Sequence, residues 1–227
     1  MNSDSSQPAT TAASDTLSAA LVRHGLALEP PQIELLDRYA RLLWDWNTKI
    51  NLTRHTDYDK FAGRDIADTL QLAAHLKPGE EVLDVGTGGG VPGLPLAILR
   101  PDLKVTLCDS VAKKVRVVAE ISEQLGLPIE AHAVRAEELV EDGRYDALVI
   151  RAVGPLWKLL ATFKSHWRSF RRMLVVKGPK WPEELNEAKR RGLVNQLQIK
   201  TAAEYAMPGA DGKSVILKIW PKNVRER

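Results

Sequence analysis

The fold is decided by Glu81-Val82-Leu83-Asp84-Val85-Gly86-Thr87-Gly88-Gly89-Gly90-Val91-Pro92-Gly93-Leu94-Pro95, a short apolar segment that leads into a glycine run. Four of the five residues 86–90 are glycine. Glycine loses conformational entropy in a helix or strand and packs no side chain, so this run predicts a loop whose backbone approaches a ligand. Pro92 and Pro95 fit the first turn of a following helix, where N–H groups have no intrahelical acceptor. We predict a strand over 81–85, a ligand-binding loop and a helix over about 92–100.

After residue 80, short apolar runs alternate with helical patterns, which is typical of a parallel sheet covered by helices on both faces. Further strands are expected over residues 104–108, 129–134, 145–150, 173–177, 196–204 and 214–220. Further helices are expected over about 111–125, 136–141, 155–167 and 182–193. The turn at 208–212 is short enough to join an antiparallel pair at the sheet edge. The pattern predicts an α/β fold with a doubly wound, seven-stranded sheet in residues 79–222.

The residues before the sheet divide into two zones. Residues 1–16 are rich in Ser, Thr, Ala and Asp and have too few large apolar side chains to order themselves, so we expect a disordered tail. From residue 17 to 78 the pattern is helical. Its clearest stripe consists of Ile33, Leu36, Ala40 and Leu43, which predicts a helical N-terminal subdomain. A basic tail follows the sheet at 223–227.

Composition narrows the class of protein. The 227 residues are 44% hydrophobic and 27% charged, as in ordinary soluble domains. Apolar runs fall well short of the roughly 20 residues of a membrane span, and the N-terminus lacks the features of a secretory signal. The single cysteine, Cys108, excludes an internal disulfide, and the five histidines show no metal-ligand spacing. We expect a cytoplasmic monomer that binds neither membrane nor metal.

The charge is unevenly distributed along the chain. Residues 1–150 carry 15 Lys/Arg and 23 Asp/Glu, a balance of −8, whereas residues 151–227 carry 17 and 6, a balance of +11. Within the basic part, Trp167 and Phe170 interleave with Arg168, Arg171 and Arg172. Such a mixture suits a surface that meets phosphates and stacks on bases, although a solvated helix face over a tryptophan core gives the same pattern.

The glycine run permits two registers with different ligands. Gly88-x-Gly90-x-x-Gly93, with Asp109 about 20 residues further on, matches the dinucleotide fingerprint of oxidoreductases. Asp84-x-Gly86-x-Gly88-x-Gly90 instead places an acid at the strand end, which suits S-adenosylmethionine because this cofactor has no pyrophosphate and carries an ammonium and a sulfonium. We favour the second register. In it, Asp109 would accept hydrogen bonds from the ribose hydroxyls, although it could equally cap the next helix.

Several segments across roughly residues 35–220 carry a more specific pattern. They are Asn51-Leu52-Thr53, 64–69, 84–97, Asp109-Ser110 with 113–116, Ile150-Arg151-Ala152 and Val176-Lys177-Gly178. Together they resemble the bacterial small-subunit ribosomal RNA guanine-N7 methyltransferases, the RsmG or GidB family. The most diagnostic part is the double-proline continuation Val91-Pro92-Gly93-Leu94-Pro95. Three positions depart from the family pattern: Asp65 stands where histidine usually follows Arg64, Thr69 replaces a serine, and Lys213 replaces an arginine near the final hairpin.

The resemblance implies a class I, Rossmann-like methyltransferase that uses S-adenosylmethionine to methylate N7 of one guanine in small-subunit ribosomal RNA, either free or in the 30S particle. The residues expected at the cofactor are Asp84, Gly86, Gly88, Val91, Asp109, Ala136, Glu137 and Arg151, with Ala136 acting through its backbone. The residues expected at the RNA are Asn51, Arg64, Lys177 and Lys213. The Asp65 and Lys213 departures concern the RNA contacts and leave the cofactor site unchanged.

The expected chemistry requires no catalytic acid or base. Guanine N7 has an exposed lone pair and no proton, so methyl transfer needs in-line positioning. The sequence after the fourth strand, Arg151-Ala152-Val153-Gly154-Pro155, lacks the motif of exocyclic-amine methyltransferases. Cytosine-C5 methylation needs an exposed cysteine nucleophile, whereas Cys108 lies in an expected strand. A nucleotide-dependent oxidoreductase and a nonenzymatic RNA-binding module remain as alternatives.

Overall fold

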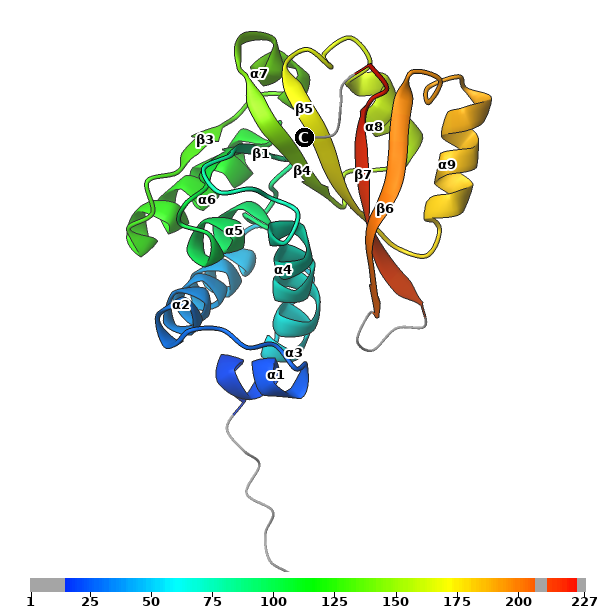
Figure 1. Ribbon diagram of the computed structural model, residues 1–227. Helices are drawn as coiled ribbons and strands as arrows, with labels where there is room; N and C mark the ends of the chain where they lie inside the picture. The colour runs from blue at the N-terminus through cyan, green and yellow to red at the C-terminus, as the bar shows by residue number, and fades with distance from the viewer. Residues whose placement is uncertain (1–14, 207–211, 224–227) are drawn as a thin grey trace, which may run out of the picture.

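A computed structural model describes residues 15–206 and 212–223 of the chain (Figure 1). The expected disordered tail lies almost entirely outside the described residues, as do most of the 208–212 turn and the basic tail. Around the sheet, helices from the N-terminal half gather on one side and helices from the C-terminal half on the other. This arrangement determines which residues meet at each edge of the sheet.

The sheet has seven strands, as predicted, in the order β3-β2-β1-β4-β5-β7-β6. The strands are β1 (Glu81–Val85), β2 (Lys104–Cys108), β3 (Glu130–His132), β4 (Tyr145–Arg151), β5 (Phe170–Lys177), β6 (Leu197–Ala206) and β7 (Lys213–Pro221). The first five are parallel, and β7 runs antiparallel to both β5 and β6. The edge strand β3 is shorter than the predicted 129–134, because the chain leaves the sheet after His132, whose carbonyl accepts the N–H of Asp109.

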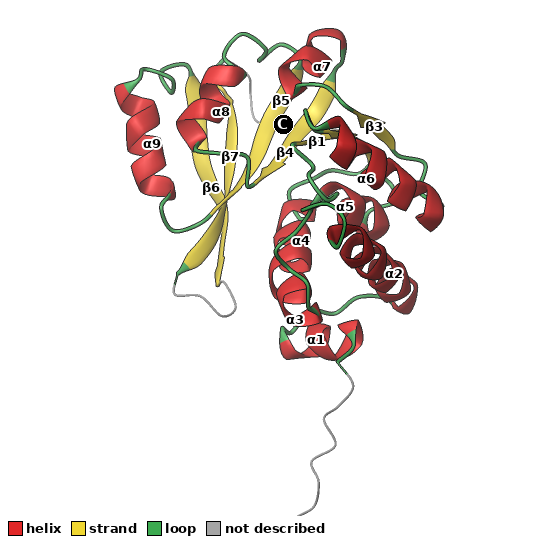
Figure 2. Cartoon of the chain, turned by 180° about the vertical axis from the view of Figure 1, so that it is seen from behind, coloured by secondary structure: helices red, strands yellow, loops and turns green. Residues whose placement is uncertain are grey.

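Helices precede the sheet and connect its strands (Figure 2). They are α1 (Leu17–Arg23), α2 (Pro30–Asn47), α3 (Tyr58–Lys60), the π-helix η1 (Phe61–Ile66), α4 (Ala67–Ala73), α5 (Gly93–Leu99), α6 (Ala112–Leu125), α7 (Ala136–Asp142), α8 (Leu156–Thr162) and α9 (Trp181–Arg190). The prediction of a helix over 155–167 was too long. The residues after Thr162 form tight turns, with Lys164 and His166 each donating to the carbonyl three residues earlier.

The two faces of the sheet bury different apolar clusters. Alternate residues of one strand point to opposite faces, so Val82 packs with α2, α4, α5 and α6, whereas Leu83 packs with α7 and α8. On β4, Val149 and Ile150 divide in the same way. Burial on both faces explains why these strands are almost continuously apolar. The N-terminal helices share the first cluster with the sheet, so they are packed onto it through a common core.

Candidate functional site

A cleft of about 600 Å³ lies at the carboxyl edge of the central parallel strands. Strands β1, β2 and β4 all end there, and ligands of doubly wound sheets bind at this edge. The cleft is lined by the glycine loop, Asp109, the first turn of α7 and Arg151, together with Leu52 and Thr53 from the N-terminal region. The structure thus brings together most of the residues predicted at the cofactor.

The glycine loop is tied tightly to its neighbours. The N–H groups of Gly86 and Thr87 both donate to the carbonyl of Cys108, each at 2.9 Å, which attaches the loop to β2. Gly86 has a φ of +70°, and a Cβ atom there would lie 2.5 Å from Cγ2 of Val153. Any other residue at this position would be strained by its backbone and would collide with Val153.

Asp84 lies beneath the loop and is completely buried. Its Oδ2 accepts hydrogen bonds from Thr87 Oγ1 at 2.6 Å and from the N–H of Gly93 at 2.9 Å. Burial raises the pKa of Asp84 to about 6, although these two hydrogen bonds act in the opposite direction. The carboxylate therefore shapes the loop from below, and Asp84 is not among the residues that line the cleft.

The same contact bears on the dinucleotide register. A pyrophosphate would need free N–H groups at the start of α5. Instead, the N–H of Gly93, the first residue of α5, is taken by Asp84, and that of Leu94 donates to Gly90. A buried carboxylate at this helix terminus disfavours a bound phosphate, so the structure favours the register that begins at Asp84.

Asp109 follows β2 and faces the loop across the cleft. Its Oδ2 accepts the N–H of Gly88 at 3.0 Å, and its Oδ1 accepts the N–H of Val111 at 2.9 Å, just before α6. The N-cap of α6 is Val111, so Asp109 lies two residues before the cap and does not itself cap the helix. Each carboxylate oxygen can accept more than one hydrogen bond, and ribose binding by Asp109 stays a prediction. On the adjoining wall, Ala136 and Glu137 form the first turn of α7, where backbone N–H groups have no acceptor within the helix.

Arg151 ends β4 between two buried carboxylates. Its Nη2 donates to Asp65 Oδ1, and its Nη1 lies 3.5 Å from Asp68 Oδ2 without donating a hydrogen bond to it. Burial lowers the pKa of Arg151, but the two carboxylates outweigh that effect and raise it. Asp65 also contacts His55, whose Nδ1 lies 2.8 Å from Oδ1, and Asp68 accepts the hydroxyl of Tyr205 at 2.7 Å.

The sequence pattern assigned the departure at Asp65 to the RNA contacts and predicted an unchanged cofactor site, whereas Asp65 lines the cleft and pairs with Arg151. Asp65 lies in η1, and π-helical turns are frequent at functional sites. Its side chain is 1% exposed, and its Oδ2 has no hydrogen-bond partner among the described residues. Spacing could not reveal the Asp65–Arg151 pair, because 86 residues separate the two positions.

The N-terminal helices contribute directly to the site, which the sequence did not indicate. Tyr39 of α2 donates from its buried hydroxyl to the carbonyl of Gly89 at 2.8 Å. Asn47 Oδ1 accepts the N–H groups of Leu52 and Thr53 at 2.8 and 2.9 Å, which orients the segment that lines the cleft. Tyr39 lies among apolar residues of the helical segment, and nothing in its spacing distinguishes a hydroxyl that reaches the loop.

The four residues expected at RNA are less uniformly placed. Asn51 is exposed beside Leu52, and Arg64 is half-buried in η1. Lys177 is buried, lies 2.6 Å from Glu184 Oε2 and donates to the carbonyl of Gly154. Lys213 is exposed on β7 and pairs with Glu204 at 2.6 Å. The structure therefore places Asn51 and Arg64 near the cleft and engages the two lysines in ion pairs.

Other reactive groups are scarce near the cleft. Burial raises the pKa of Cys108 to about 12, which opposes a nucleophilic role. Within residues 15–206 and 212–223, no cluster of His, Cys, Asp and Glu could hold a metal ion. In the same part of the chain, no helix combines the length and apolarity that crossing a membrane would need.

Comparisons with known proteins agree with this geometry. The model of the GidB family, described as rRNA small subunit methyltransferase G, matches residues 32–209. Ribosomal RNA small subunit methyltransferase G of Rhodopirellula baltica is 47% identical over 188 residues, which cover 83% of this chain and 81% of the relative. The protein of the same name from Chromobacterium violaceum is 40% identical over 211 residues, with coverages of 90% and 98%.

Solved structures share the fold at lower sequence identity. A mutant of MtNAS in complex with S-adenosylmethionine is 14% identical with a TM-score of 0.57, covering 90% of this chain and 77% of that one. TrmK of M. capricolum in complex with S-adenosyl-homocysteine is 16% identical with a TM-score of 0.54, with coverages of 70% and 71%.

Proposed function

This chain belongs to the rRNA small subunit methyltransferase G family, and from that premise we propose that it methylates N7 of one guanine in small-subunit ribosomal RNA. It is an S-adenosylmethionine-dependent rRNA methyltransferase. The observation that carries the proposal is the convergence of Asp109, the first turn of α7 and the glycine loop on one cleft. We further propose a cytoplasmic monomer that acts on this RNA, free or in the 30S particle.

The residues of the cleft fit S-adenosylmethionine. Asp109 offers free lone pairs to the ribose hydroxyls, while its existing hydrogen bond holds Gly88 in place. The backbone N–H of Ala136 can donate to the adenine, and Glu137 lies beside it as an acceptor for the amino group. Gly86, Gly88 and Val91 present the loop backbone, which Asp84 holds from below.

The chemistry needs positioning and charge balance more than proton transfer. The cofactor supplies a methyl group made electrophilic by its sulfonium. Guanine N7 has a lone pair and no proton to lose, so a base is not required. The acceptor ring becomes cationic on methylation. The carboxyl group of Asp65, which lines the cleft beside Arg151 and His55, is placed to stabilise that positive charge.

Access to the base requires an unpaired or flipped guanine. We propose Asn51 and Arg64 as RNA contacts, because they flank segments that line the cleft. Lys177 and Lys213 stay proposals of lower weight. Each would have to exchange a carboxylate partner, Glu184 or Glu204, for an RNA phosphate.

The direct test is incubation with methyl-labelled S-adenosylmethionine and small-subunit RNA or 30S particles that lack the modification, followed by mapping of the label. We expect one N7-methylguanine. Label at another atom or on another RNA would refute the proposed acceptor.

A matched pair of glycine variants tests the cofactor site. Gly86→Ala should abolish or strongly weaken S-adenosylmethionine binding in calorimetry, because its Cβ would meet Val153 at 2.5 Å. Gly126→Ala is the control: its φ of +71° is nearly the same, but a Cβ there has no neighbour within 4 Å. Equal cofactor affinities for the two variants would contradict the assigned site.

A further inference from the structure

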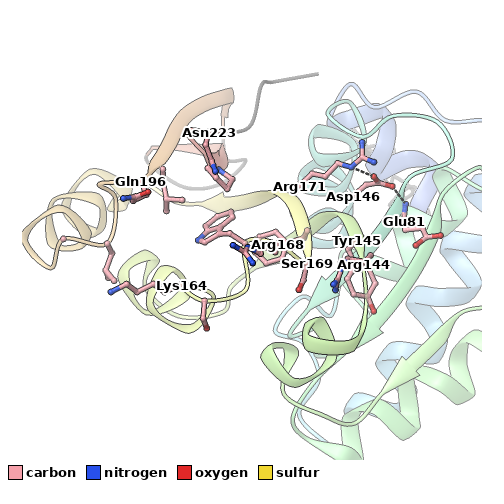
Figure 3. Close-up of a pocket in the computed structure, with 17 residues that line it drawn as sticks. Glu81, Arg144, Tyr145, Asp146, Lys164, Arg168, Ser169, Arg171, Gln196 and Asn223 are labelled. Carbon is pink, nitrogen blue, oxygen red and sulfur yellow. Dashed lines mark hydrogen bonds and ion pairs between the residues drawn. The ribbon is translucent and has the colours of Figure 1, made fainter.

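A second and larger cleft lies at the opposite edge of the sheet, with a volume of about 1070 Å³. It is bounded by the amino ends of β4 and β5, by residues 164–169 between α8 and β5, and by residues 192–197 between α9 and β6 (Figure 3). We refer to it as the amino-edge cleft. Neither the cofactor nor the target guanine, as placed above, reaches this edge, so the cleft has no assigned role.

Most of the charged side chains that line the amino-edge cleft are cations. Arg144, Lys164, Arg168 and Arg171 line it, against the carboxylates of Glu81 and Asp146. Both carboxylates already have partners, because Asp146 pairs with Arg171 at 3.0 Å and Glu81 pairs with Lys104 at 3.1 Å.

The three remaining cations, Arg144, Lys164 and Arg168, are exposed, and no carboxylate lies within ion-pair distance of them among the described residues. Within the part of the chain that the structure describes, the one hydrogen bond from the Arg144 side chain goes to the carbonyl of its neighbour Gly143. In Figure 3, Lys164 and Arg144 lie on opposite sides of the cleft, with Arg168 between them. The cleft therefore offers three uncompensated positive charges around one concavity, which suits a phosphodiester chain.

An aromatic ring lies among these charges. Trp167 is half-buried, lines the cleft and packs on Phe170 with a centroid distance of 4.9 Å. A ring fixed from one side by the core and open at a basic cleft can stack on a base.

The side chains that line the amino-edge cleft favour RNA over a protein partner or a small anion as its ligand. Apolar side chains also line the cleft, among them Trp167, Leu193 and Leu197, but each is buried or half-buried and so offers little of the exposed apolar surface that a protein partner would be expected to cover. A small anion would need buried, convergent donors, whereas the unpaired cations here are exposed.

The distance between the two clefts sets a minimum length for any ligand that occupies both. Strand β4 runs from Tyr145 in the amino-edge cleft to Arg151 in the cofactor cleft, and seven residues of strand span roughly 20 Å. A ligand that occupies both clefts must therefore be at least this long, a condition that an RNA chain meets.

We propose that the amino-edge cleft is a second binding surface for small-subunit ribosomal RNA, which holds a phosphodiester segment remote from the methylated guanine. The inference rests on the proposed function. In this arrangement the second cleft supplies substrate affinity and orientation, while the cofactor cleft supplies the chemistry. It accounts for part of the basic character of residues 151–227.

The test removes two of the unpaired cations together. The double variant Lys164→Gln with Arg168→Gln is compared with Arg23→Gln with Lys60→Gln, which removes the same charge from exposed side chains at the N-terminal helices. Binding of protein-free small-subunit RNA is measured by filter retention over a range of salt concentrations. Methyl transfer to that RNA and to 30S particles, and S-adenosylmethionine affinity, are measured in parallel.

We expect the Lys164/Arg168 variant to raise the KM for RNA roughly tenfold and to reduce the slope of log affinity against log salt by about 2. Its S-adenosylmethionine affinity and its kcat at saturating RNA should equal those of the wild type. The Arg23/Lys60 variant should match the wild type in every measurement.

Three results have distinct meanings. An unchanged KM and salt slope in the Lys164/Arg168 variant would overturn the second surface while the wild type still methylates RNA. A defect confined to 30S particles, with free-RNA binding intact, would assign the cleft to a ribosomal protein and also overturn it. Absence of methyl transfer by the wild type would instead refute the proposed function. In that case the slope of log RNA affinity against log salt concentration, compared between the variants, would still show whether the amino-edge cleft binds RNA.

Discussion

Replacement of Asp84 by asparagine should stabilise the protein at neutral pH. Burial raises the pKa of Asp84 from its ordinary value of 3.8 to about 6, so the folded state binds a proton more tightly than the unfolded state between these values. The protonated carboxyl group of Asp84 therefore makes its full contribution to the free energy of unfolding below pH 3.8, and this contribution is lost as the pH rises through about 6. The shift corresponds to about 3 kcal/mol.

Asparagine imitates the neutral acid at every pH. Its amide oxygen can take the hydrogen bonds from Thr87 and Gly93, while its N–H₂ replaces Oδ1, which has no partner among the described residues. We expect the free energy of unfolding of Asp84→Asn, relative to the wild type, to rise by about 3 kcal/mol between about pH 4 and pH 7. S-adenosylmethionine affinity should fall, because the negative charge beneath the loop is lost.

Urea denaturation of both proteins across this pH range measures the difference. If an amide N–H of the asparagine stays unpaired, it lowers the free energy of unfolding of the variant by the same amount at every pH. The test therefore compares how the difference between variant and wild type changes with pH. Asp102→Asn is the control: Arg100 lowers the pKa of Asp102, so this variant should lose stability as the pH rises, by a small amount because the pair is exposed. A pH-independent difference for Asp84→Asn would refute the reasoning.

Three further predictions concern the surroundings of the cofactor cleft. Cys108 should resist alkylation by iodoacetamide in the native protein, since burial raises its pKa to about 12; labelling as fast as in the unfolded protein, followed by mass spectrometry, would contradict this. Asp65→Ala should lower the free energy of unfolding by about 3 kcal/mol by breaking its buried pair with Arg151, and a loss below about 1 kcal/mol in urea would argue against that pair. Tyr39→Phe should cost about 1 kcal/mol and weaken S-adenosylmethionine binding, because the carbonyl of Gly89 loses its donor; calorimetry showing unchanged affinity would separate α2 from the site.

The parallel strands were predictable because their pattern is local. β1 and β2 occupy the predicted residues 81–85 and 104–108, since runs buried on both faces are continuously apolar and are bounded by polar or glycine residues. The end of α8 was not predictable in this way. Phe163 and Trp167 continue the apolar pattern beyond Thr162 and pack against the core, but they lie in turns in which Lys164 and His166 donate to carbonyls three residues earlier.

The site was predictable where its residues adjoin the strand ends. Asp109, Ala136 and Arg151 follow predicted strands, and parallel strands bring their carboxyl ends to one edge. Asp65 and Tyr39 come from the N-terminal helices, whose docking depends on tertiary packing that a single sequence does not encode as spacing. The change to aspartate at position 65 gains a physical meaning only when the pair with Arg151 is seen.

The basic C-terminal third also changes meaning once its charges are placed. Arg151, Arg172 and Lys177 are among its cations, yet each is mostly buried against a carboxylate, Arg172 with Glu80 at 2.6 Å. Arg151 and Arg172 could not turn to a phosphate without leaving a buried acid unpaired, whereas Glu184, the partner of Lys177, is 27% exposed. A count of charges along the sequence therefore overstates the RNA-facing surface. Among the described residues, the exposed cations outside ion pairs include Lys164 and Arg168 at the amino-edge cleft and Lys158 at the cofactor cleft, so we expect both edges of the sheet to contribute to RNA affinity.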